Sequence, residues 1–232
     1  MKKNILIIGG SSGIGRALVD ILSPQHNIYV ASRTNESLAN AAVTHLTHHV
    51  LNDELNVDNL PEQLDGFVYC PGSINLRPFR GLKAATFQDD FNLNVVGAVK
   101  SLQAVLPLLQ KNDQASIVFY STVAVSTGMP FHASVAAAKG ALEGLTRSLA
   151  AEYAPKFRVN CIAPSLTDTP LAEKFLNNDA KVEKAEERHP LKKVGTAKNI
   201  AQMTAFLLGE ESQWMTGQIL HVDGGIGDLK TN

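Results

Sequence analysis

The stretch ILIIGGSSGIGRALVDIL, near the start of the chain, constrains the fold more than any other stretch. An apolar run ends at Ile8, a glycine-rich turn covers residues 9–15, and an amphipathic helical pattern follows. Glycines permit a tight turn and let the backbone approach a ligand closely. The helix that follows offers free N–H groups and the positive end of its dipole to an anion. This order of elements predicts the first βα unit of an α/β protein that binds a dinucleotide through its pyrophosphate.

Short apolar runs and longer helical patterns alternate through the rest of the chain. Strands are predicted at residues 4–8, 27–31, 48–51, 66–70, 115–121, 158–163 and 218–222. Helices are predicted near residues 13–22, 35–45, 86–110, 133–153 and 197–209. Strands separated by helices indicate βαβ units. We therefore predict a doubly wound α/β (Rossmann) fold, with about seven parallel strands and helices on both faces of the sheet.

A single domain, 1–232, is expected to contain both the dinucleotide site and the catalytic site. α/β folds of this length are commonly one domain and bury a sizeable core. The segment 170–195 is the least regular part of the pattern, since it is charged and contains Pro170 and Pro190. We predict that this segment is a mobile flap over the substrate site.

Composition excludes several classes of partner. The formal net charge of -1 gives no electrostatic reason to expect nucleic acid or an anionic membrane. The apolar run after the N-terminal lysines, Ile5–Ile8, is too short for a signal peptide, and no later apolar segment suggests a membrane span. A cytoplasmic location is expected.

Neither the cysteines nor the histidines indicate a metal site. Cys70 and Cys161 have no metal or redox spacing, so free thiols in a reducing compartment are expected. His45, His48 and His49 are close in sequence, but His48 and His49 would point to opposite sides of a strand.

The spacing of the glycines, Gly9-x-x-x-Gly13-x-Gly15, differs from the G-x-G-x-x-G of two-domain dehydrogenases. It resembles that of the short-chain dehydrogenase/reductase family, and the resemblance extends over nearly the whole chain. Further stretches that carry it are NLNVVGA, SIVFYSTVA, KGALEGLTRSLAAEYAPKFRVNCIAPSLTDTP and MTGQILHVDGG. Within the family, the chain is most similar to single-domain bacterial 3-oxoacyl-carrier-protein reductases. The resemblance implies an NAD(P)-dependent oxidoreductase that interconverts a small-molecule carbonyl and an alcohol by hydride transfer.

The residues after the second strand favour NADP(H) over NAD(H). An NAD site usually places Asp or Glu there to bind the ribose 2′-hydroxyl, whereas this chain has Ser32 and Arg33, and its nearest carboxylate is Glu36. Arg33 suits a 2′-phosphate, which it can bind with paired hydrogen bonds. Ser11 and Ser32 can donate hydrogen bonds to the same phosphate.

The resemblance implies further cofactor contacts. After the third strand, Asn52 or Asp53 would reach the adenine. The family's Asn-Asn-Ala-Gly motif is replaced here by Tyr69-Cys70-Pro71-Gly72, so the asparagine hydrogen bonds that brace the sheet would be lost. Ser165 stands where the family usually has glycine. The complete set of implied cofactor residues is Gly9, Ser11, Ser12, Gly13, Ile14, Gly15, Ser32, Arg33, Asn52, Cys70, Pro71, Gly72, Lys139, Pro164, Ser165, Thr167 and Thr169.

The resemblance also implies a catalytic set with one member missing. Asn94 would hold a water in a proton relay, and Lys139 would bind the nicotinamide ribose. Thr122 stands at the position of the serine that polarises the substrate oxygen, with Ser121 as the alternative if the register shifts by one residue. The family's tyrosine lies four residues before the lysine, where this chain has Val135. A valine cannot transfer a proton.

Three other proton sources remain open. His132 lies about one helical turn before Val135, and an imidazole titrates near neutral pH. Tyr120 shares a strand face with Thr122 but is expected to lie in the core. A water held by Lys139, Asn94 and Thr122 is the third source. The alternative to an enzyme is a catalytically weak or inactive NADP(H)-binding regulatory protein.

The predicted helix 133–153 carries a stripe of small residues, namely Ala136, Gly140, Gly144 and Ser148. Such a stripe permits close packing on the sheet. In the family this helix also packs against a partner subunit, so a homotetramer or homodimer is expected.

Overall fold

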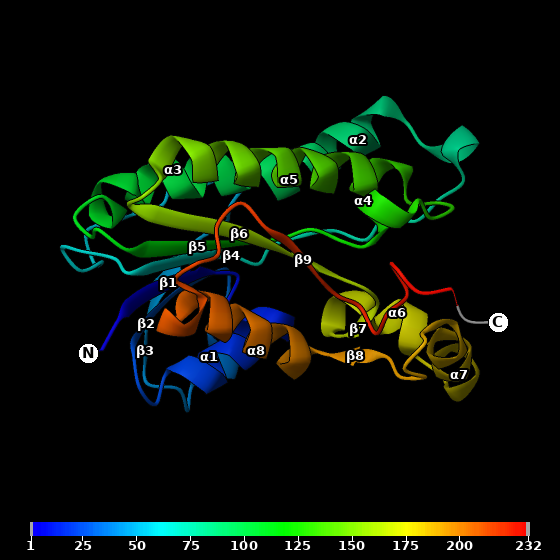
Figure 1. Cartoon of the computed structure of the whole chain (residues 1–232). Coiled ribbons are helices and arrows are strands. Elements are labelled where there is room, and N and C mark those ends of the chain that lie inside the picture. Colours follow the sequence, from blue (N-terminus) through cyan, green and yellow to red (C-terminus); the bar gives the residue numbers. More distant parts are fainter. Residues whose placement is uncertain (1, 231–232) are drawn as a thin grey trace.

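The computed structural model describes residues 2–230, so residues 1 and 231–232 of the predicted 1–232 domain lie outside the described part. A parallel sheet of seven strands, in the order β3-β2-β1-β4-β5-β6-β9, forms the centre of the molecule (Figure 1). Its strands are β1 Asn4–Ile8, β2 Asn27–Ser32, β3 Val43–Thr47, β4 Gly66–Tyr69, β5 Ala115–Tyr120, β6 Phe157–Pro164 and β9 Ile219–Val222. Two short strands, β7 (Thr167–Asp168) and β8 (Gly195–Thr196), pair separately. The predicted doubly wound sheet is confirmed.

Helices cover both faces of the sheet. On one face lie α1 (Gly13–Leu22) and α8 (Ala197–Leu208), and on the other lie α3 (Gly97–Leu109) and α5 (Ala133–Tyr153) (Figure 1). Shorter helices complete the chain: α2 Ala84–Phe91, α4 Ala124–Thr127, α6 Glu173–Leu176 and α7 Asp179–Arg188.

Alternation along the strands divides the core between the two faces. Ile5 and Ile7 pack in the core beneath α1 and α8, whereas Leu6 and Ile8 pack in the core beneath α3 and α5. Successive side chains of a strand point to opposite faces, so a strand buried on both faces has a continuous apolar run. This is why β1 was recognisable in the sequence.

The prediction for residues 35–51 is wrong. Residues 48–51 are not a strand. The strand is β3, Val43–Thr47, which pairs in parallel with β2, so that Val43 lies opposite Ile28 and Thr47 opposite Ser32. The predicted helix 35–45 is reduced to the 3₁₀ turn Glu36–Leu38. β3 is an edge strand with only one buried residue, Leu46, so its hydrophobic pattern is weak.

The predicted flap is more regular than its sequence suggested. α6 and α7 occupy much of it, and α7 is capped by the Asn178 side chain, which accepts a hydrogen bond from the Lys181 N–H. The charged residues of this segment are therefore the exposed surface of a short amphipathic helix.

α2 and α3 are joined by a π-helical segment, Asn92–Val96, into one continuous helix. This helix, Ala84–Leu109, has the length and mean hydropathy of a membrane span, which the sequence analysis did not anticipate. Its apolar residues Ala98, Leu102, Val105 and Leu109 are buried beneath it against the sheet. The core of the fold therefore accounts for its apolar character.

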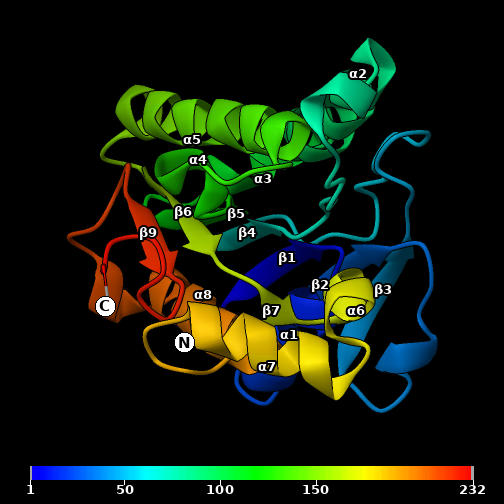
Figure 2. The ribbon, with the colours of Figure 1, turned by 90° about the vertical axis from the view of Figure 1, so that its right-hand side faces the viewer.

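The strand order reverses between β1 and β4. β2 and β3 extend from β1 in one direction, and β4, β5, β6 and β9 extend in the other. In open α/β sheets ligands bind outside the carboxyl ends of the strands at this point. Figure 2 views the molecule from this end, with α6 and α7 on one side of the sheet and α2, α4 and α5 on the other.

Candidate active site

The glycine-rich turn forms a cradle at the N-terminus of α1. Gly9 and Gly13 have positive φ angles, 78° and 53°, which side-chain-bearing residues rarely adopt. A Cβ added to Gly15 would collide with the carbonyl oxygen of Gly9, so the turn can close only around a glycine there. Ser12 caps α1 without a side-chain hydrogen bond, which leaves its hydroxyl available. The cradle has the shape and the donors that bind a pyrophosphate.

A cavity of about 540 Å³ adjoins this turn. Every cofactor residue predicted from the turn, the second strand and the Cys70-Pro71-Gly72 segment lines it. Neither Asn52 nor Asp53 lines it, so their contact with the adenine stays a prediction; His48, His49, Val50 and Leu51 line the cavity. β3 ends earlier than predicted, so these residues follow the strand directly.

His48 is the unexpected polar group of this cavity. It is only 4% exposed, and neither of its ring nitrogens has a hydrogen-bond partner within the described chain. Burial lowers the pKa of its imidazole, so the neutral ring offers one donor and one acceptor. A buried polar group without a partner is costly, but these nitrogens are shielded from the open cavity as well. The fit to a dinucleotide therefore rests on the glycine cradle and on the exposed Arg33.

Ser32 and Arg33 differ in their availability. The Ser32 hydroxyl donates to the Thr34 carbonyl at 2.8 Å and lies 3.0 Å from His45 Nε2, so it is already engaged. Arg33 is exposed at the cavity, and its guanidinium is in no ion pair with any residue of 2–230. Of Ser32 and Arg33, Arg33 is the residue that is free to bind a phosphate; Ser11, the third predicted ligand, also lines the cavity.

A second cavity, of about 800 Å³, is continuous with the first. The two share Ile14, Cys70, Gly72, Thr169 and Leu171. The second cavity brings together most of the remaining predicted site residues: Ser121, Thr122, His132, Val135, Lys139, Pro164, Ser165, Thr167 and Thr169. The two cavities therefore form one crevice. The half around the glycine-rich turn suits a dinucleotide, and the other half, the catalytic half, contains the predicted catalytic residues that line a cavity.

Lys139 lies in the wall of the catalytic half. Lys139 is only 7% exposed, and its amine donates a hydrogen bond to the Tyr120 carbonyl at 2.8 Å. Burial lowers the pKa of this amine to about 8, against the opposing effect of the nearby Cys161, Cys70 and Asp90. An amine with this pKa can both give and accept a proton near neutral pH.

Asn94 lies in the π-helical segment and is fully buried. It does not line either cavity, but its side-chain amide donates to the Asp90 carbonyl at 2.7 Å and to Ser73 Oγ at 3.0 Å. Its side-chain oxygen is buried without a partner. A Cβ built on Gly72 would lie 3.3 Å from this oxygen and 3.3 Å from the Lys139 amine, so both groups face Gly72.

Asp90 anchors a polar network beside Asn94 that the sequence analysis did not predict. Its carboxyl group accepts hydrogen bonds from Ser73 Oγ at 2.5 Å, Asn75 Nδ2 at 2.6 Å and Ser134 Oγ at 2.5 Å. The only available signal was its position one helical turn before Asn94. The donors come from two segments that are distant from Asp90 in sequence, the loop with Ser73 and Asn75 and the start of α5, and a sequence pattern does not reveal this meeting.

Thr122 and Ser121 have different surroundings. Ser121 donates to Glu143 Oε1 at 2.6 Å inside the core beneath α5, so the alternative register is not favoured. Thr122 Oγ1 accepts a 3.3 Å hydrogen bond from the Ala124 N–H, and its hydroxyl hydrogen remains available at the cavity. Of these two hydroxyl groups, Thr122 is the one placed to bond a substrate oxygen.

Val135 is 5% exposed and places an apolar side chain in the cavity wall. His132, at the N-terminus of α5, lines the same cavity, with Nδ1 2.7 Å from the Pro130 carbonyl. Tyr120 lies in the core as expected, and its hydroxyl is 2.6 Å from Thr204 Oγ1. Burial raises the Tyr120 pKa well above its usual value, which makes this phenol a poor acid.

Tyr69 stands at the first position of the replaced asparagine motif. Its hydroxyl donates to the Leu93 carbonyl at 2.6 Å in the π-helical segment. This hydrogen bond joins the end of β4 to that helix, and the loss of the asparagine hydrogen bonds stays a prediction. The neighbouring Cys70 and Cys161 are free thiols, and burial raises the pKa of each to about 12, so neither is a reactive nucleophile.

Ser165 and His189 form a pair that joins the loop after β6 to the end of α7. Ser165 Oγ lies 2.9 Å from His189 Nε2, and His189 Nδ1 lies 2.7 Å from the Ala185 carbonyl. The serine that replaces the family's glycine thus has a partner on the flap. Within residues 2–230, no cluster of His, Cys, Asp or Glu is arranged to bind a metal ion.

The fold and this crevice define a nucleotide-dependent oxidoreductase of the Rossmann class. A family model described as enoyl-(acyl carrier protein) reductase matches residues 10–227. The chain belongs to the short-chain dehydrogenase/reductase family and is one of its oxidoreductases. The resemblance seen in the sequence is confirmed.

Known relatives match along their full length. A 3-oxoacyl-(acyl-carrier-protein) reductase of Thermotoga maritima is 30% identical over 241 residues, which cover 97% of both chains. A tropinone reductase homolog of Arabidopsis thaliana is 31% identical over 242 residues, covering 96% of this chain and 91% of that protein. The structure of ElxO with NADP bound is 26% identical with a TM-score of 0.88, covering 97% of this chain and 99% of the other.

Proposed function

We propose that this protein is an NADP(H)-dependent oxidoreductase that interconverts a carbonyl and an alcohol. The observation that carries the proposal is the buried Lys139 amine, in a cavity wall shared with Thr122 and continuous with the dinucleotide crevice. Support comes from relatives named as reductases and from a similar structure solved with NADP.

The residues that would hold the cofactor follow from the two cavities. The glycine cradle and Ser12 would bind the pyrophosphate, Arg33 the 2′-phosphate, the segment 48–51 the adenine and Lys139 the nicotinamide ribose. The reduced nicotinamide supplies hydride to the substrate carbonyl carbon. Every other requirement of the reaction, namely orientation of the carbonyl and delivery of one proton, belongs to the protein.

Thr122 orients the carbonyl by donating its hydroxyl hydrogen to the substrate oxygen. The Lys139 ammonium would give its proton to the substrate oxygen, directly or through a water held by Lys139, Asn94 and Thr122, and would then be reprotonated from solvent. The side chains of Lys139 and Asn94 both face Gly72. Such a water would also satisfy the unpaired Asn94 oxygen. His132 is the second candidate donor, since it lines the same cavity.

The test is consumption of NADPH, followed by its absorbance, over a panel of aldehydes and ketones. We expect turnover of activated carbonyls, with tighter binding of NADPH than of NADH by calorimetry. Arg33→Ala should abolish most of that preference because it removes the phosphate ligand. Equal affinity for the two cofactors would reject the cofactor assignment. Cofactor binding without turnover of any carbonyl would reject the enzyme and favour the alternative, an NADP(H)-binding regulatory protein.

The proposal extends to the setting of the enzyme. It would act in the cytoplasm on a small-molecule substrate, as a homo-oligomer built on α5 and the β9 edge.

A further inference from the structure

The catalytic cavity is lined by an unusual set of charges. Besides Lys139, its lining contains the cations Arg77, Lys174, Lys181, Lys184 and Arg188, and no aspartate or glutamate among residues 2–230 lines it. The chain as a whole has a formal net charge of -1, so composition does not explain this excess. A cleft with charges of one sign on low-dielectric walls focuses its field on the enclosed space.

α7 shows how the charges are sorted. Its sequence, DAKVEKAEER, contains both signs. Lys181, Lys184 and Arg188 follow the spacing of one helical face and line the cavity together with the buried Ala185. The acidic residues of the helix lie at other positions and do not line it. The spacing of Lys181, Lys184 and Arg188 along α7 therefore places its cations at the cavity and its carboxylates away from it.

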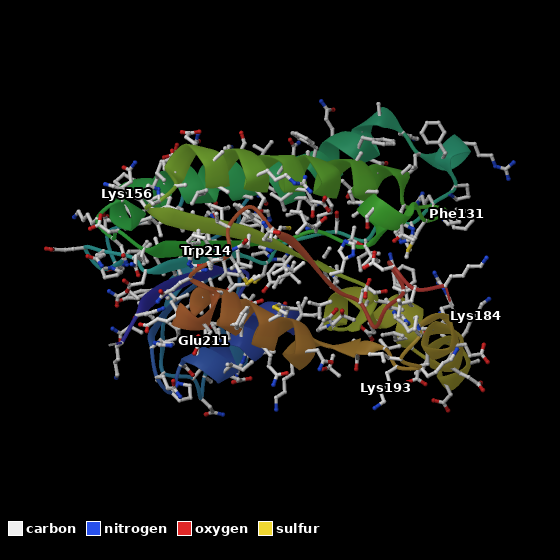
Figure 3. All side chains as sticks on the ribbon, viewed as in Figure 1. Phe131, Lys156, Lys184, Lys193, Glu211 and Trp214 are labelled. Atoms are coloured by element: carbon white, nitrogen blue, oxygen red, sulfur yellow. The ribbon has the colours of Figure 1, made fainter. Side chains whose placement is uncertain are left out.

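The remaining cations link the two sides of the opening. Lys174, from α6, donates its amine hydrogen to the Ile74 carbonyl at 3.0 Å, which joins the flap to the 73–77 loop. Arg77 stands on that loop, whose backbone also bonds to Phe131. Figure 3 labels Phe131 and Lys184 at the same end of the molecule, on opposite sides of the end of the sheet.

None of these five cations forms an ion pair with any residue of 2–230. The Lys181 amine donates to the Lys174 carbonyl and to Asn177 Oδ1, and Lys174 donates to the Ile74 carbonyl. Arg77, Lys184 and Arg188 are the cations whose side chains have no hydrogen-bond or ion-pair partner within that range. The inner walls are apolar, with Ile74, Leu76, Met129, Val135 and Leu166. A ligand that matches this cavity has an apolar body and an anionic end.

We propose that the carbonyl substrate is an anion, with a carboxylate or phosphate group that Lys184, Arg188 and Arg77 bind while its carbonyl lies at Thr122 and Lys139. This inference rests on the proposed function and names the substrate class of the same site. The phosphates of the cofactor do not account for these cations, because Arg33 and the glycine cradle line the other half of the crevice.

The experiment compares matched aldehydes under NADPH: 4-carboxybenzaldehyde, 4-formylphenyl phosphate and the neutral methyl 4-formylbenzoate. We expect kcat/KM for at least one anionic aldehyde to exceed that for the ester by tenfold or more. Comparison of 4-carboxybenzaldehyde with 4-formylphenyl phosphate identifies which anionic group the site prefers. Lys184→Gln/Arg188→Gln should lower that ratio at least tenfold, chiefly through KM. Lys193→Gln, on the loop after α7 and outside the cavity lining, is the matched control and should leave the ratio unchanged.

Each outcome decides one of the two claims. Turnover of the ester with no preference for either anion overturns the anionic substrate and leaves the oxidoreductase intact. If no aldehyde is reduced, the proposed function fails, and calorimetry with 4-(hydroxymethyl)benzoate and its methyl ester tests the anion site separately. Binding of 4-(hydroxymethyl)benzoate but not of its methyl ester, with loss of that binding in Lys184→Gln/Arg188→Gln, would support the anion site. Equal binding of the benzoate and the ester would overturn the anion site.

Discussion

Under the proposed function, Val135 leaves the delivery of the proton to other residues. In the wall of the catalytic cavity it occupies the place where the family resemblance implies a tyrosine, four residues before Lys139 on α5. The burial that lowers the Lys139 pKa is partly a consequence of this apolar neighbourhood. A lysine that would otherwise tune a phenol is here the strongest candidate for the proton donor itself.

Val135→Tyr is expected to raise the rate of carbonyl reduction at least tenfold on a simple activated ketone. The spacing to Thr122 and Lys139 suits a hydroxyl at this position, and a general acid typically contributes about 10²–10⁴-fold. Steady-state NADPH oxidation measures the effect. Val135→Phe is the matched control, since it adds the same ring without the hydroxyl, and an equal gain in both variants would contradict the acid role.

The Lys139 pKa predicts a pH profile. The amine is protonated below its pKa of about 8, so kcat/KM for reduction should be constant below that pH and fall about tenfold per pH unit above it. Alcohol oxidation needs the free amine and should show the opposite trend. Rates measured from pH 6 to 10 in both directions test this. If His132→Ala abolishes the profile, His132 is the donor and the Lys139 route is wrong.

Site residues were predictable wherever a local pattern fixes them. Gly13 was found from the spacing of the glycines, and Lys139 and Thr122 from the family resemblance, and the structure places all three along one crevice. Asp90, His48 and His189 were missed because their meaning depends on partners distant in sequence. A buried polar side chain becomes informative only when its surroundings are known.

At the scale of the element, the π-helical segment between α2 and α3 is the feature that positions the site. This segment places the Asn94 side chain next to Gly72. Tyr69, at the end of β4, attaches the segment to the sheet by its hydrogen bond to the Leu93 carbonyl. Gly97 follows directly, and a Cβ there would collide with the Tyr69 hydroxyl. The Tyr69 hydroxyl therefore occupies the space that a side chain at position 97 would need, so the two residues must match in size.

Gly97→Ala is expected to destabilise the protein by about 1–3 kcal/mol, the usual cost of overpacking, despite the better helix propensity of alanine. Tyr69→Phe removes the atom that the new methyl would meet, at the cost of its hydrogen bond to Leu93. The double variant should therefore lose about 1 kcal/mol less than the sum of the two single losses. Thermal and urea unfolding provide the measurement. Additive losses would show that the two residues are not coupled.

Elements were predictable in proportion to their burial. β1 and β5 lie inside the sheet and have uninterrupted apolar runs, so both were placed within a residue or two of their observed limits. β3 has one buried residue, and a helix was expected across part of it. α7 contains one buried residue, Ala185, so its order comes from its cap and from His189 rather than from a hydrophobic stripe.

The whole molecule presents two faces that suit further copies of the chain. The outer surface of α5 includes the exposed Gly144, where an added Cβ would meet no atom within 4 Å. At the far edge of the sheet, all four residues of β9 are only half-buried, and the neighbouring Trp214 is fully exposed, at 100% (Figure 3). Self-complementary contacts on two different faces generate a tetramer with two-fold axes.

We predict a homotetramer at micromolar concentration, assembled through the α5 face and the β9 edge. Gly144→Glu places a charge opposite its own copy across the first two-fold axis, and Trp214→Glu does so near the second. Each single variant should then form dimers, and the double variant should form monomers. Light scattering coupled to size exclusion measures the mass, and Lys193→Glu, away from both faces, is the control that should stay tetrameric. A wild-type monomer would reject the assembly, and a dimer unaffected by Gly144→Glu would remove α5 from the interface.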